Sequence, residues 1–481
     1  MESMKEIMLK KRIILFGAGF YGKNACNRLK EKHTIECIID NNADVIGSSL
    51  NGVLIKSVDA LKEYDLEDID IIICSKYYGE MATQLNSMGI NRFFVTMEGF
   101  IYLFDEEGIF QPVEIENNKI YRKENGKKTI LFVQNAACIR THKIAKLMRE
   151  AGYNVCLLYT LVPPINGYLE YKDTYENIWG FSSEIGIIDF INNSDFDIIH
   201  CSNEPDILAT VCKRTNKPVV FDTHDMQSVR GSVDSNALML EYLANKCCDA
   251  NMYVSEGIRD IAIAKYNLED KDIFVLRNMV YDQVDVSYVS HKKLSDIDNE
   301  IHSVYEGGVV GDNKGNHRYF KNIWLSIAEK GIHIHFYSNQ NVNYCRYLDS
   351  LSPYIHYEGE MAGTELIKEM VKYDCGLVLF NVTDQNRTHL EKTSTNKIYE
   401  YINAGLPIIV GDINTHINFV KEYKVGCVFD SDNIEQVFND ALKIEIDRDF
   451  LKNNRMTLKS KQSELRDFYE LVMKKYREKN K

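Results

Sequence analysis

The sequence lacks the features that mark membrane-spanning, secreted and nucleic-acid-binding proteins. No apolar run approaches the ~20 residues that a membrane-spanning helix requires. The N-terminal stretch MESMKEIMLKK has no apolar signal-peptide core. Lys and Arg number 57 against 70 Asp and Glu, which gives a net charge of −13 and argues against the basic face that nucleic acid requires. We therefore expect a cytoplasmic protein without a nucleic-acid partner, and peripheral association with the inner face of the membrane stays open.

Cysteine pairs of the Cys-x-x-Cys type are also missing, and Cys247-Cys248 is the only close pair in the sequence. The 12 cysteines are scattered, and none forms a Cys-x-x-Cys pair. Because metal-binding and redox cysteines usually come in such closely spaced pairs, and no signal-peptide core is present, we expect reduced thiols and no zinc site. The 481 residues are enough for about three domains of ~100–200 residues each.

The first hundred residues have the order of a Rossmann-type nucleotide-binding unit. Residues 12–16 predict a buried strand, residues 23–31 a helix and residues 35–39 a second strand. A glycine-rich turn between strand and helix lets the backbone approach a phosphate, and an acid after the second strand can bind a ribose. The residues that fill these positions are Gly17, Gly19, Gly22 and Asp40.

Further strands over 69–74 and 92–95 complete this unit, which we place at residues 1–110. It resembles the small Rossmann domains that precede sugar acetyltransferases. The resemblance implies a nucleotide or NAD-like ligand, whereas the alternative is that the glycines only form a tight turn. The charged, Asn-rich stretch 105–128 is expected to be a linker or a hairpin connection.

A second alternation of strands and helices follows in residues 125–285. Its apolar runs are short and do not alternate with polar residues, which is typical of parallel strands covered by helices on both faces. The expected strands are 129–133, 154–159, 195–200, 218–221 and 250–254, with a helix over 140–151.

Candidate catalytic residues follow strand 218–221. His224 and Asp225 come after this strand, where loops of open α/β sheets meet their ligands. A carboxylate there could position a hydroxyl group, and a histidine could move a proton near neutral pH. The alternative is that Asp222 or Asp225 caps the next helix. His142 is a third candidate, and its alternative is an ordinary surface position in the first turn of a helix.

The third domain is expected over residues 290–481. A strand over 303–306 leads into Gly307-Gly308 and a polar loop that ends at Arg318. Small residues let the backbone approach a diphosphate, and an Arg could neutralise its charge. Other strands are expected at 332–337, 354–357, 376–380, 407–410 and 426–429, with helices over 363–372 and 448–478.

The segment 390–411, LEKTSTNKIYEYINAGLPIIVG, is the most informative stretch of the chain. Ser394 or Thr395 is expected to cap a helix that continues to residue 404, and Gly405 then supplies a left-handed residue. The start of this helix would offer exposed N–H groups and the charge of Lys397 to a phosphate. Glu400 lies in the first turn, where its carboxylate could accept hydrogen bonds from sugar hydroxyls.

The pattern N-K-[apolar]-[aromatic]-E-Y-x-x-A-G-x-P resembles the donor-site segment of GT-B glycosyltransferases, especially retaining family four (glycosyltransferase group 1). The resemblance implies an α/β protein of three Rossmann-like parallel-sheet domains, the last two forming a GT-B pair closed by a C-terminal crossover helix. Family four usually has a second glutamate eight residues before the one at Glu400. This sequence departs from that pattern, because Lys392 occupies the position and Glu391 lies one place away. The implied donor-binding residues are Gly307, Gly308, Arg318, Thr395, Asn396, Lys397 and Glu400.

By this resemblance the protein moves a sugar from a nucleotide-sugar donor to a glycan or lipid-linked acceptor in surface polysaccharide synthesis. Transfer is expected to retain the anomeric configuration and to require no metal or other cofactor. Two alternatives remain, a non-catalytic nucleotide-sugar-binding protein and a sugar-nucleotide oxidoreductase acting through the first domain. Lys397, Glu400 and Asp225 favour an enzyme.

Overall fold

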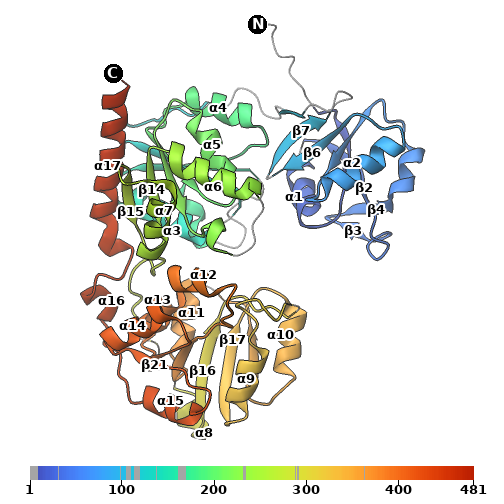
Figure 1. Cartoon of the computed structure of the whole chain (residues 1–481). Coiled ribbons are helices and arrows are strands. Elements are labelled where there is room, and N and C mark those ends of the chain that lie inside the picture. The colour runs from blue at the N-terminus through green and yellow to red at the C-terminus, as the bar shows by residue number, and fades with distance from the viewer. Residues whose placement is uncertain are drawn as a thin grey trace. The chain divides into compact units, whose positions relative to one another are not determined.

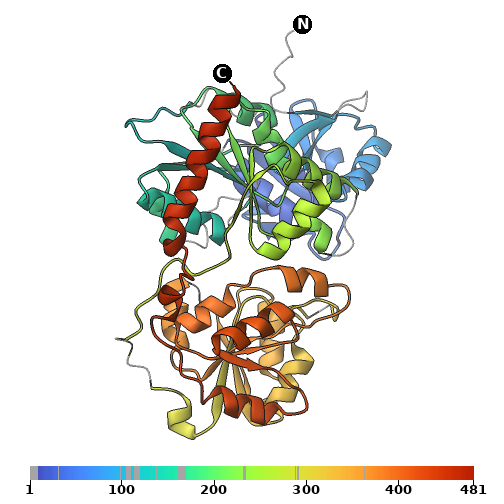
Figure 2. The ribbon, with the colours of Figure 1, turned by 60° about the vertical axis from the view of Figure 1, so that its left-hand side comes forward.

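The computed structural model describes residues 9–480 except 31, 98, 105–109, 113–119, 137, 161–168, 231–234, 288, 290–291, 312 and 362. The chain divides into two compact units (Figures 1 and 2). The first holds Met1–Asp222, Tyr242–Asn251 and Tyr469–Lys481, and the second holds Thr223–Glu241 and Met252–Phe468. Three sheets with helices packed against them make up the described chain, so the predicted α/β class with three parallel-dominated sheets is confirmed.

The first sheet has the order β3-β4-β2-β1-β5-β6-β7-β8. Its centre, from β4 to β6, is parallel. Strand β3 pairs antiparallel with β4, and β7 pairs antiparallel with both β6 and β8; the strands predicted from the sequence did not include these three. Helix α1 contributes to one apolar cluster and α2 to another, so both faces of the sheet are covered. The elements are β1 (Arg12–Phe16), α1 (Phe20–Leu29), β2 (Thr34–Asp40), β3 (Ser49–Leu50), β4 (Val53–Ser57), β5 (Ile69–Ile73), α2 (Tyr78–Ser87), β6 (Phe93–Met97), β7 (Phe100–Phe104) and β8 (Phe110–Pro112).

Strand β7 ties this sheet to the next core. Phe100 and Tyr102 belong to the apolar cluster of the second sheet. The backbone N–H of Ile101 donates to the Ser182 carbonyl (2.9 Å), and the Tyr102 hydroxyl donates to Glu184 (3.2 Å). Much of the expected linker, residues 105–109 and 113–119, lies outside the described residues.

The second sheet has the order β11-β10-β9-β12-β13-β14-β15, and its pairs from β11 to β13 are parallel. Buried runs such as that of β9 carry apolar residues on both faces, as helices on both sides require. The elements are β9 (Thr129–Gln134), α3 (Ile139–Glu150), β10 (Asn154–Tyr159), β11 (Asn177–Gly180), α4 (Glu184–Asn192), β12 (Ile198–Ser202), α5 (Ile207–Lys213), β13 (Val219–Thr223), α6 (Ser235–Cys247), β14 (Ala250–Tyr253), α7 (Glu256–Tyr266) and β15 (Asp272–Val275).

The third sheet is parallel throughout, with the order β18-β17-β16-β19-β20-β21. Its core includes Trp324 and Phe336, both without exposed surface. The elements are α8 (Ser295–Asp298), β16 (Ile301–Glu306), α9 (Lys321–Ala328), β17 (Ile332–Tyr337), α10 (Val342–Asp349), β18 (Ile355–Gly359), α11 (Gly363–Met370), β19 (Cys375–Val378), α12 (Arg387–Lys392), α13 (Lys397–Asn403), β20 (Ile408–Val410), α14 (Asn414–Tyr423), β21 (Gly426–Val428) and α15 (Ile434–Ala441).

The C-terminal helix is shorter than the sequence predicted. Instead of one helix over 448–478, the chain forms α16 (Phe450–Asn453) and then α17 (Gln462–Lys479). Arg455 between them has a left-handed φ of +54°, which ends the first helix. Helix α17 lies along the second sheet in Figures 1 and 2, where the Tyr469 hydroxyl bonds His200 Nδ1 at 2.7 Å.

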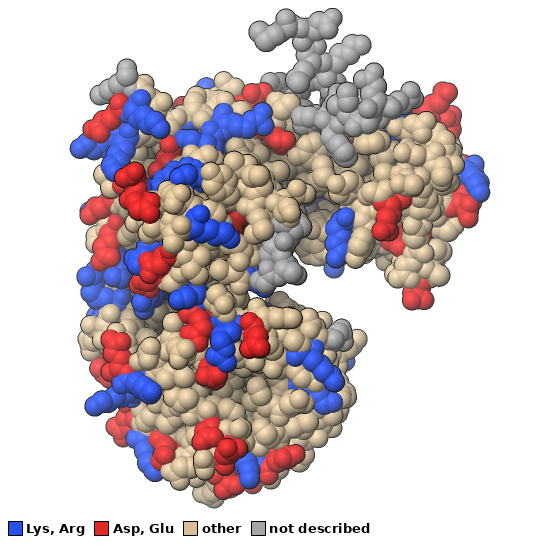
Figure 3. All heavy atoms as spheres, viewed as in Figure 1, with Lys and Arg blue, Asp and Glu red and all other residues tan. Residues whose placement is uncertain are grey.

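The surface carries charges of both signs. On the face shown in Figure 3, Lys and Arg side chains are interspersed with Asp and Glu. Among the described helices, none is both long and apolar enough to cross a membrane. The expected absence of a nucleic-acid partner stays a prediction.

Candidate functional site

Segment 390–411 folds into a helix and a strand as predicted, but the helix is capped differently. Helix α13 begins at Lys397, and neither Ser394 nor Thr395 is its capping residue. Asn396 caps it through its backbone, because its carbonyl accepts the N–H groups of Tyr399 (3.0 Å) and Glu400 (3.1 Å). The helix ends as expected at Gly405, whose φ is +78°.

The side chain of Lys397 turns back over the third sheet. Its Nζ lies 5.2 Å from the centre of the Tyr305 ring and 5.8 Å from that of Phe380. Burial lowers the pKa of Lys397, whereas the nearby carboxylate of Glu306 opposes this shift. An ammonium group in this partly desolvated place would be stabilised by an anion.

The loop after β16 meets the tip of Lys397. Gly307 has a φ of +116°, and a Cβ at this residue would lie 3.0 Å from Lys397 Nζ. A Cβ at Gly308 would lie 2.5 Å from Arg318 Nη1. The backbone of both glycines is thus directly exposed to a cationic side chain. The structure brings together four of the predicted donor-binding residues at the carboxyl end of β16.

The other three predicted donor-binding residues lie near Lys397 in segment 390–411. Thr395, Asn396 and Glu400 are all half-buried. Glu400 raises the pKa of Lys397, although less than Glu306 does, which places its carboxylate near the ammonium group. The helix that carries Glu400 has only seven residues. The charges of Lys397 and Arg318 are therefore a firmer basis for anion binding than the helix dipole.

Two histidines of this site were missed by sequence reasoning. Burial, with the charge of Arg318 next, lowers the pKa of His317 to about 4, and burial also lowers the pKa of His389. The ring centres of the two histidines are 6.3 Å apart. His317 is therefore neutral at pH 7. The available signal was the position of His317 in the loop that follows the two glycines and of His389 immediately before segment 390–411, in α12.

The carboxylate of Asp225 belongs to the same compact unit as these histidines. It is half-buried, accepts a hydrogen bond from Arg230 Nη2 at 2.5 Å and lies 3.8 Å from His389 Nε2. His224, its neighbour, is also half-buried. Asp222 does not serve as a helix cap, because it forms a fully buried two-point ion pair with Arg140 (2.9 and 3.0 Å).

His142 cannot reach a substrate in this structure. It has no exposed surface, and its Nδ1 bonds the Tyr175 hydroxyl at 2.7 Å. Its ring also stacks on that of Tyr171. The alternative interpretation, an exposed position on the helix, is wrong as well. His142 instead packs α3 against the segment that precedes β11.

Lys392, at the position of the family's first glutamate, and its neighbour Glu391 both form contacts that hold other segments in place. Lys392 is exposed, and its carbonyl accepts a hydrogen bond from Ser255. Glu391 accepts hydrogen bonds from the backbone N–H and the side-chain amide of Asn414, both at 3.0 Å. Glu391 therefore holds the start of α14.

The glycine loop of the first sheet is a tight turn between β1 and α1. Gly17 has a φ of +114°, and a Cβ at Gly22 would collide with the Gly17 carbonyl. Gly19 precedes α1 as its cap residue. Asp40 accepts a hydrogen bond from the Ala18 N–H at 2.6 Å, which places its carboxylate against the loop. Binding by these residues stays a prediction.

Three family models match parts of the chain. Residues 139–283 match "Glycosyltransferase Family 4", and residues 315–454 match "Glucosyltransferase 3-like, C-terminal domain". This chain is a glycosyltransferase of the GT-B fold. Residues 9–93 match "C2185-like, N-terminal", and the likeness of this domain to those preceding sugar acetyltransferases stays a prediction.

Solved structures support the fold. The glycosyltransferase from Rickettsia africae is 13% identical, with a TM-score of 0.52 over 73% of this chain and 100% of its own. Anabaena HepE, solved in complex with UDP and glucose, is 11% identical, with a TM-score of 0.51 over 71% of this chain and 99% of its own. A comparison with curated protein sequences gave no match.

Proposed function

We propose that this glycosyltransferase takes its sugar from a nucleotide-sugar donor held at the Gly307–Gly308 loop. One observation carries the proposal: Lys397 and Arg318 approach the backbone of two consecutive glycines from the side-chain positions that the glycines leave empty. A diphosphate fits this arrangement because it is a dianion that needs both charge and close backbone approach.

The same arrangement supports the chemical step. Breaking the bond between sugar and diphosphate leaves negative charge on the diphosphate. Fixed cations placed where this charge develops lower the barrier, and such preorganised stabilisation is commonly the largest catalytic contribution. Lys397 and Arg318 would supply it without a metal ion, so we propose metal-independent transfer. Retention of the anomeric configuration is proposed on the resemblance to family four alone.

The nucleotide base has a candidate position beside the same loop. A surface pocket of about 370 Å³ is lined by Gly311 and residues 341–344. Gln340, which immediately precedes this stretch, contacts the Cβ position of Gly308. Because the pocket borders the loop that would hold the diphosphate, we propose that the base enters it. HepE was solved with UDP and with glucose, so uridine nucleotide sugars are the first ligands to test.

The acceptor is proposed to be a glycan or a lipid-linked sugar of surface polysaccharide synthesis. A lipid-linked acceptor is supported by α6, which exposes Leu238 (37%), Met239 (57%), Tyr242 (43%) and Leu243 (39%). These residues are spaced by one and four positions and share one face of the helix. Such a face suits peripheral binding to a cytoplasmic membrane surface. The first domain is proposed to bind a nucleotide or NAD-like ligand that is not needed for transfer.

The experiment is a thermal-shift screen of nucleotide sugars, followed by an assay of released nucleotide with a mixed glycolipid extract as acceptor. Binding raises the melting temperature in proportion to RT ln(1 + [L]/Kd). An enzyme should release nucleotide from the ligand that stabilises it, with or without chelator. Stabilisation without any turnover would favour a non-catalytic binding protein, and reduction of NAD would favour an oxidoreductase.

A further inference from the structure

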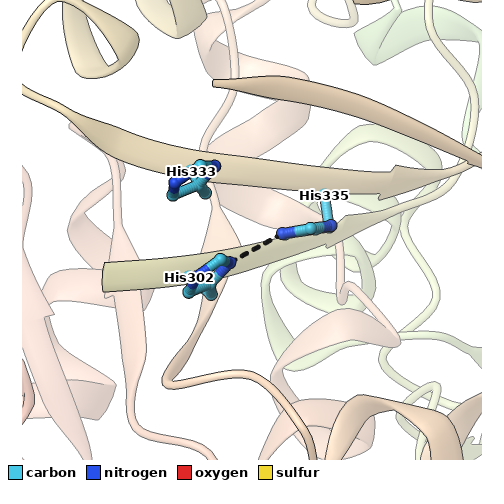
Figure 4. A group of neighbouring side chains, drawn as sticks. All are labelled: His302, His333 and His335. Carbon is cyan, nitrogen blue, oxygen red and sulfur yellow. Dashed lines mark hydrogen bonds between the residues drawn. The ribbon is translucent and has the colours of Figure 1, made fainter. Parts of the chain in front are cut away.

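Four histidines gather at the amino-terminal ends of β16, β17 and β18. The strand register pairs His302 with His333 and His335 with His356, so all four side chains lie on one face of the sheet. Figure 4 shows His302, His333 and His335 close together on the neighbouring strands β16 and β17. Gly307 is five residues beyond His302 along β16, which at ~3.3 Å per residue puts the cluster about 16 Å from the donor loop.

The hydrogen bonds of His302 and His335 form a chain between two carboxylates. His302 bonds Asp298 through Nε2 (3.0 Å) and His335 bonds Glu358 through Nδ1 (2.6 Å). Their remaining nitrogens, His302 Nδ1 and His335 Nε2, face each other at 2.9 Å. If both outer nitrogens donate to the carboxylates, two neutral rings would point two lone pairs at each other. Both facing nitrogens therefore have a partner only when one additional positive charge lies between the rings.

His333 has the same arrangement. Its Nε2 bonds Glu300 at 2.5 Å, and its Nδ1 faces His356 Nε2 at 2.7 Å. Each of the three central histidines thus has one nitrogen on a carboxylate and its other nitrogen turned toward a second imidazole. Histidines that bind metal ions are held in this way, because the outer carboxylate fixes the tautomer and makes the inner nitrogen a better ligand.

We propose that His302, His333 and His335 bind one divalent transition-metal ion, with zinc as the reference ion. One ligand nitrogen from each of the three comes within 4.8 Å of the others. Tetrahedral zinc with Zn–N distances near 2.0–2.1 Å requires nitrogens about 3.3 Å apart. The facing nitrogens of His302 and His335, at 2.9 Å, must therefore move slightly apart, whereas the His333 nitrogen, within 4.8 Å of both, must come to the same spacing. The ion supplies the positive charge that the facing nitrogens of His302 and His335 require.

Binding also requires a small movement of the rings. The rings of His302 and His333 stack with centres 4.3 Å apart and planes 5° apart. Because a lone pair lies in the plane of its ring, one of these rings has to tilt before both can reach one ion. His333 and its partner Glu300, which is 45% exposed, lie toward the surface and can move, whereas His302 and His335 are buried.

The ligand set and the location define what the ion does. Imidazole nitrogens suit zinc, copper, nickel and iron, whereas magnesium and calcium prefer oxygen ligands. Since the cluster lies far from the donor loop, the ion clamps the first residues of β16 to β17 and takes no part in transfer. The expectation that the chain binds no zinc considered cysteine spacing only. The alternation His-x-His in β17 was the signal that it left out.

The test uses the full chain, freed of metal with a chelator and then titrated with Zn²⁺ against a chromophoric competitor. We expect one tight site per chain that excess Mg²⁺ and Ca²⁺ do not displace, and a rise in melting temperature on adding Zn²⁺. Replacing the outer partner, Glu358→Gln, should weaken binding about 10- to 100-fold, and His335→Gln should weaken it further. The matched control is His33→Gln in the first domain, which should bind Zn²⁺ like the unchanged chain.

Co²⁺ loading of the unchanged chain makes the test independent of any variant. We expect the visible absorption of tetrahedral cobalt without a thiolate charge-transfer band. The proposal is overturned if the chain binds no stoichiometric Zn²⁺, if the cobalt spectrum shows thiolate ligands, or if His33→Gln weakens binding as much as His335→Gln. Far-UV circular dichroism of each metal-free variant confirms that a lost site does not reflect an unfolded chain.

Discussion

Lys397→Met should show how much of the donor affinity comes from the diphosphate and how much from the rest of the donor. Methionine has an unbranched apolar side chain of similar length, and it lacks the charge that in Lys397 lies over the Tyr305 and Phe380 rings. A hydrogen bond to a charged group contributes about 1.5–3 kcal/mol, which corresponds to roughly a 10- to 100-fold loss of donor affinity. Because burial already lowers the pKa of Lys397, the ammonium is poorly solvated there, and we expect a loss near the upper end.

The assay compares a nucleoside diphosphate with the matching nucleoside by calorimetry. The diphosphate should lose affinity in Lys397→Met, whereas the nucleoside, which has no phosphate, should bind as before. Lys421→Met, the same change at an exposed lysine of α14, is the control. Equal losses for both ligands, or unchanged diphosphate affinity in a folded variant, would refute the assignment of Lys397 to the diphosphate.

Three further predictions concern other parts of the chain. If Glu400 holds the donor ribose, Glu400→Gln should weaken donor binding several-fold to tenfold, and the 2′-deoxynucleotide should show no such difference. Residues 120–481 without the first domain should keep transfer activity but melt at lower temperature, because Phe100 and Tyr102 leave the second core; loss of transfer in a folded truncation would contradict this. Burial lowers the pKa of His416 to about 4, below its unfolded value, so its contribution to stability is present above pH 6.5 and is lost as pH falls toward 4. By pH 5 the loss is about 2 kcal/mol, and urea unfolding of His416→Leu should show a correspondingly smaller drop between pH 7.5 and 5.

Local sequence rules predicted the backbone of segment 390–411 well. Gly405 adopts the left-handed conformation that its position after a helix suggested, and the strand that follows begins at Ile408. Gly307 and Gly308 likewise have side-chain positions that neighbouring residues fill. In each case the residue is a glycine, and a glycine at such a position indicates a backbone geometry that other residues do not fit. Only the cap was wrong, because Asn396 satisfies the helix start through its backbone.

Features that depend on residues far apart in the chain were not predictable in this way. His142 is buried because Tyr175 and Tyr171, some thirty residues later, cover it. Strand β7 packs into the second core although its sequence reads as the end of the first domain. The histidines of β16 and β17 become one cluster only through the strand register, which a single sequence does not display.

The acceptor side offers a prediction in which a structural and a catalytic role can be told apart. Asp225 has two cationic or potentially cationic neighbours, Arg230 at 2.5 Å and His389 at 3.8 Å. If it positions the acceptor hydroxyl or steadies positive charge on the sugar, Asp225→Asn should lower turnover by orders of magnitude. Donor affinity should stay nearly constant, since Lys397 and Arg318 are unchanged.

Arg230→Gln is the matched control for this experiment. If Asp225 only held Arg230 in place, removing Arg230 would reproduce the loss of turnover, and the carboxylate would have no role of its own. We expect instead that Arg230→Gln keeps most of the activity, because the carboxylate remains and can still accept a hydrogen bond from the acceptor. His224→Gln should lower turnover less than Asp225→Asn. The amide of Gln can still position a hydroxyl group in place of His224, whereas the amide of Asn cannot supply the negative charge of Asp225. A fall in donor affinity as large as the fall in turnover in Asp225→Asn would show that Asp225 supports the fold of the donor site, and its acceptor role would then be wrong.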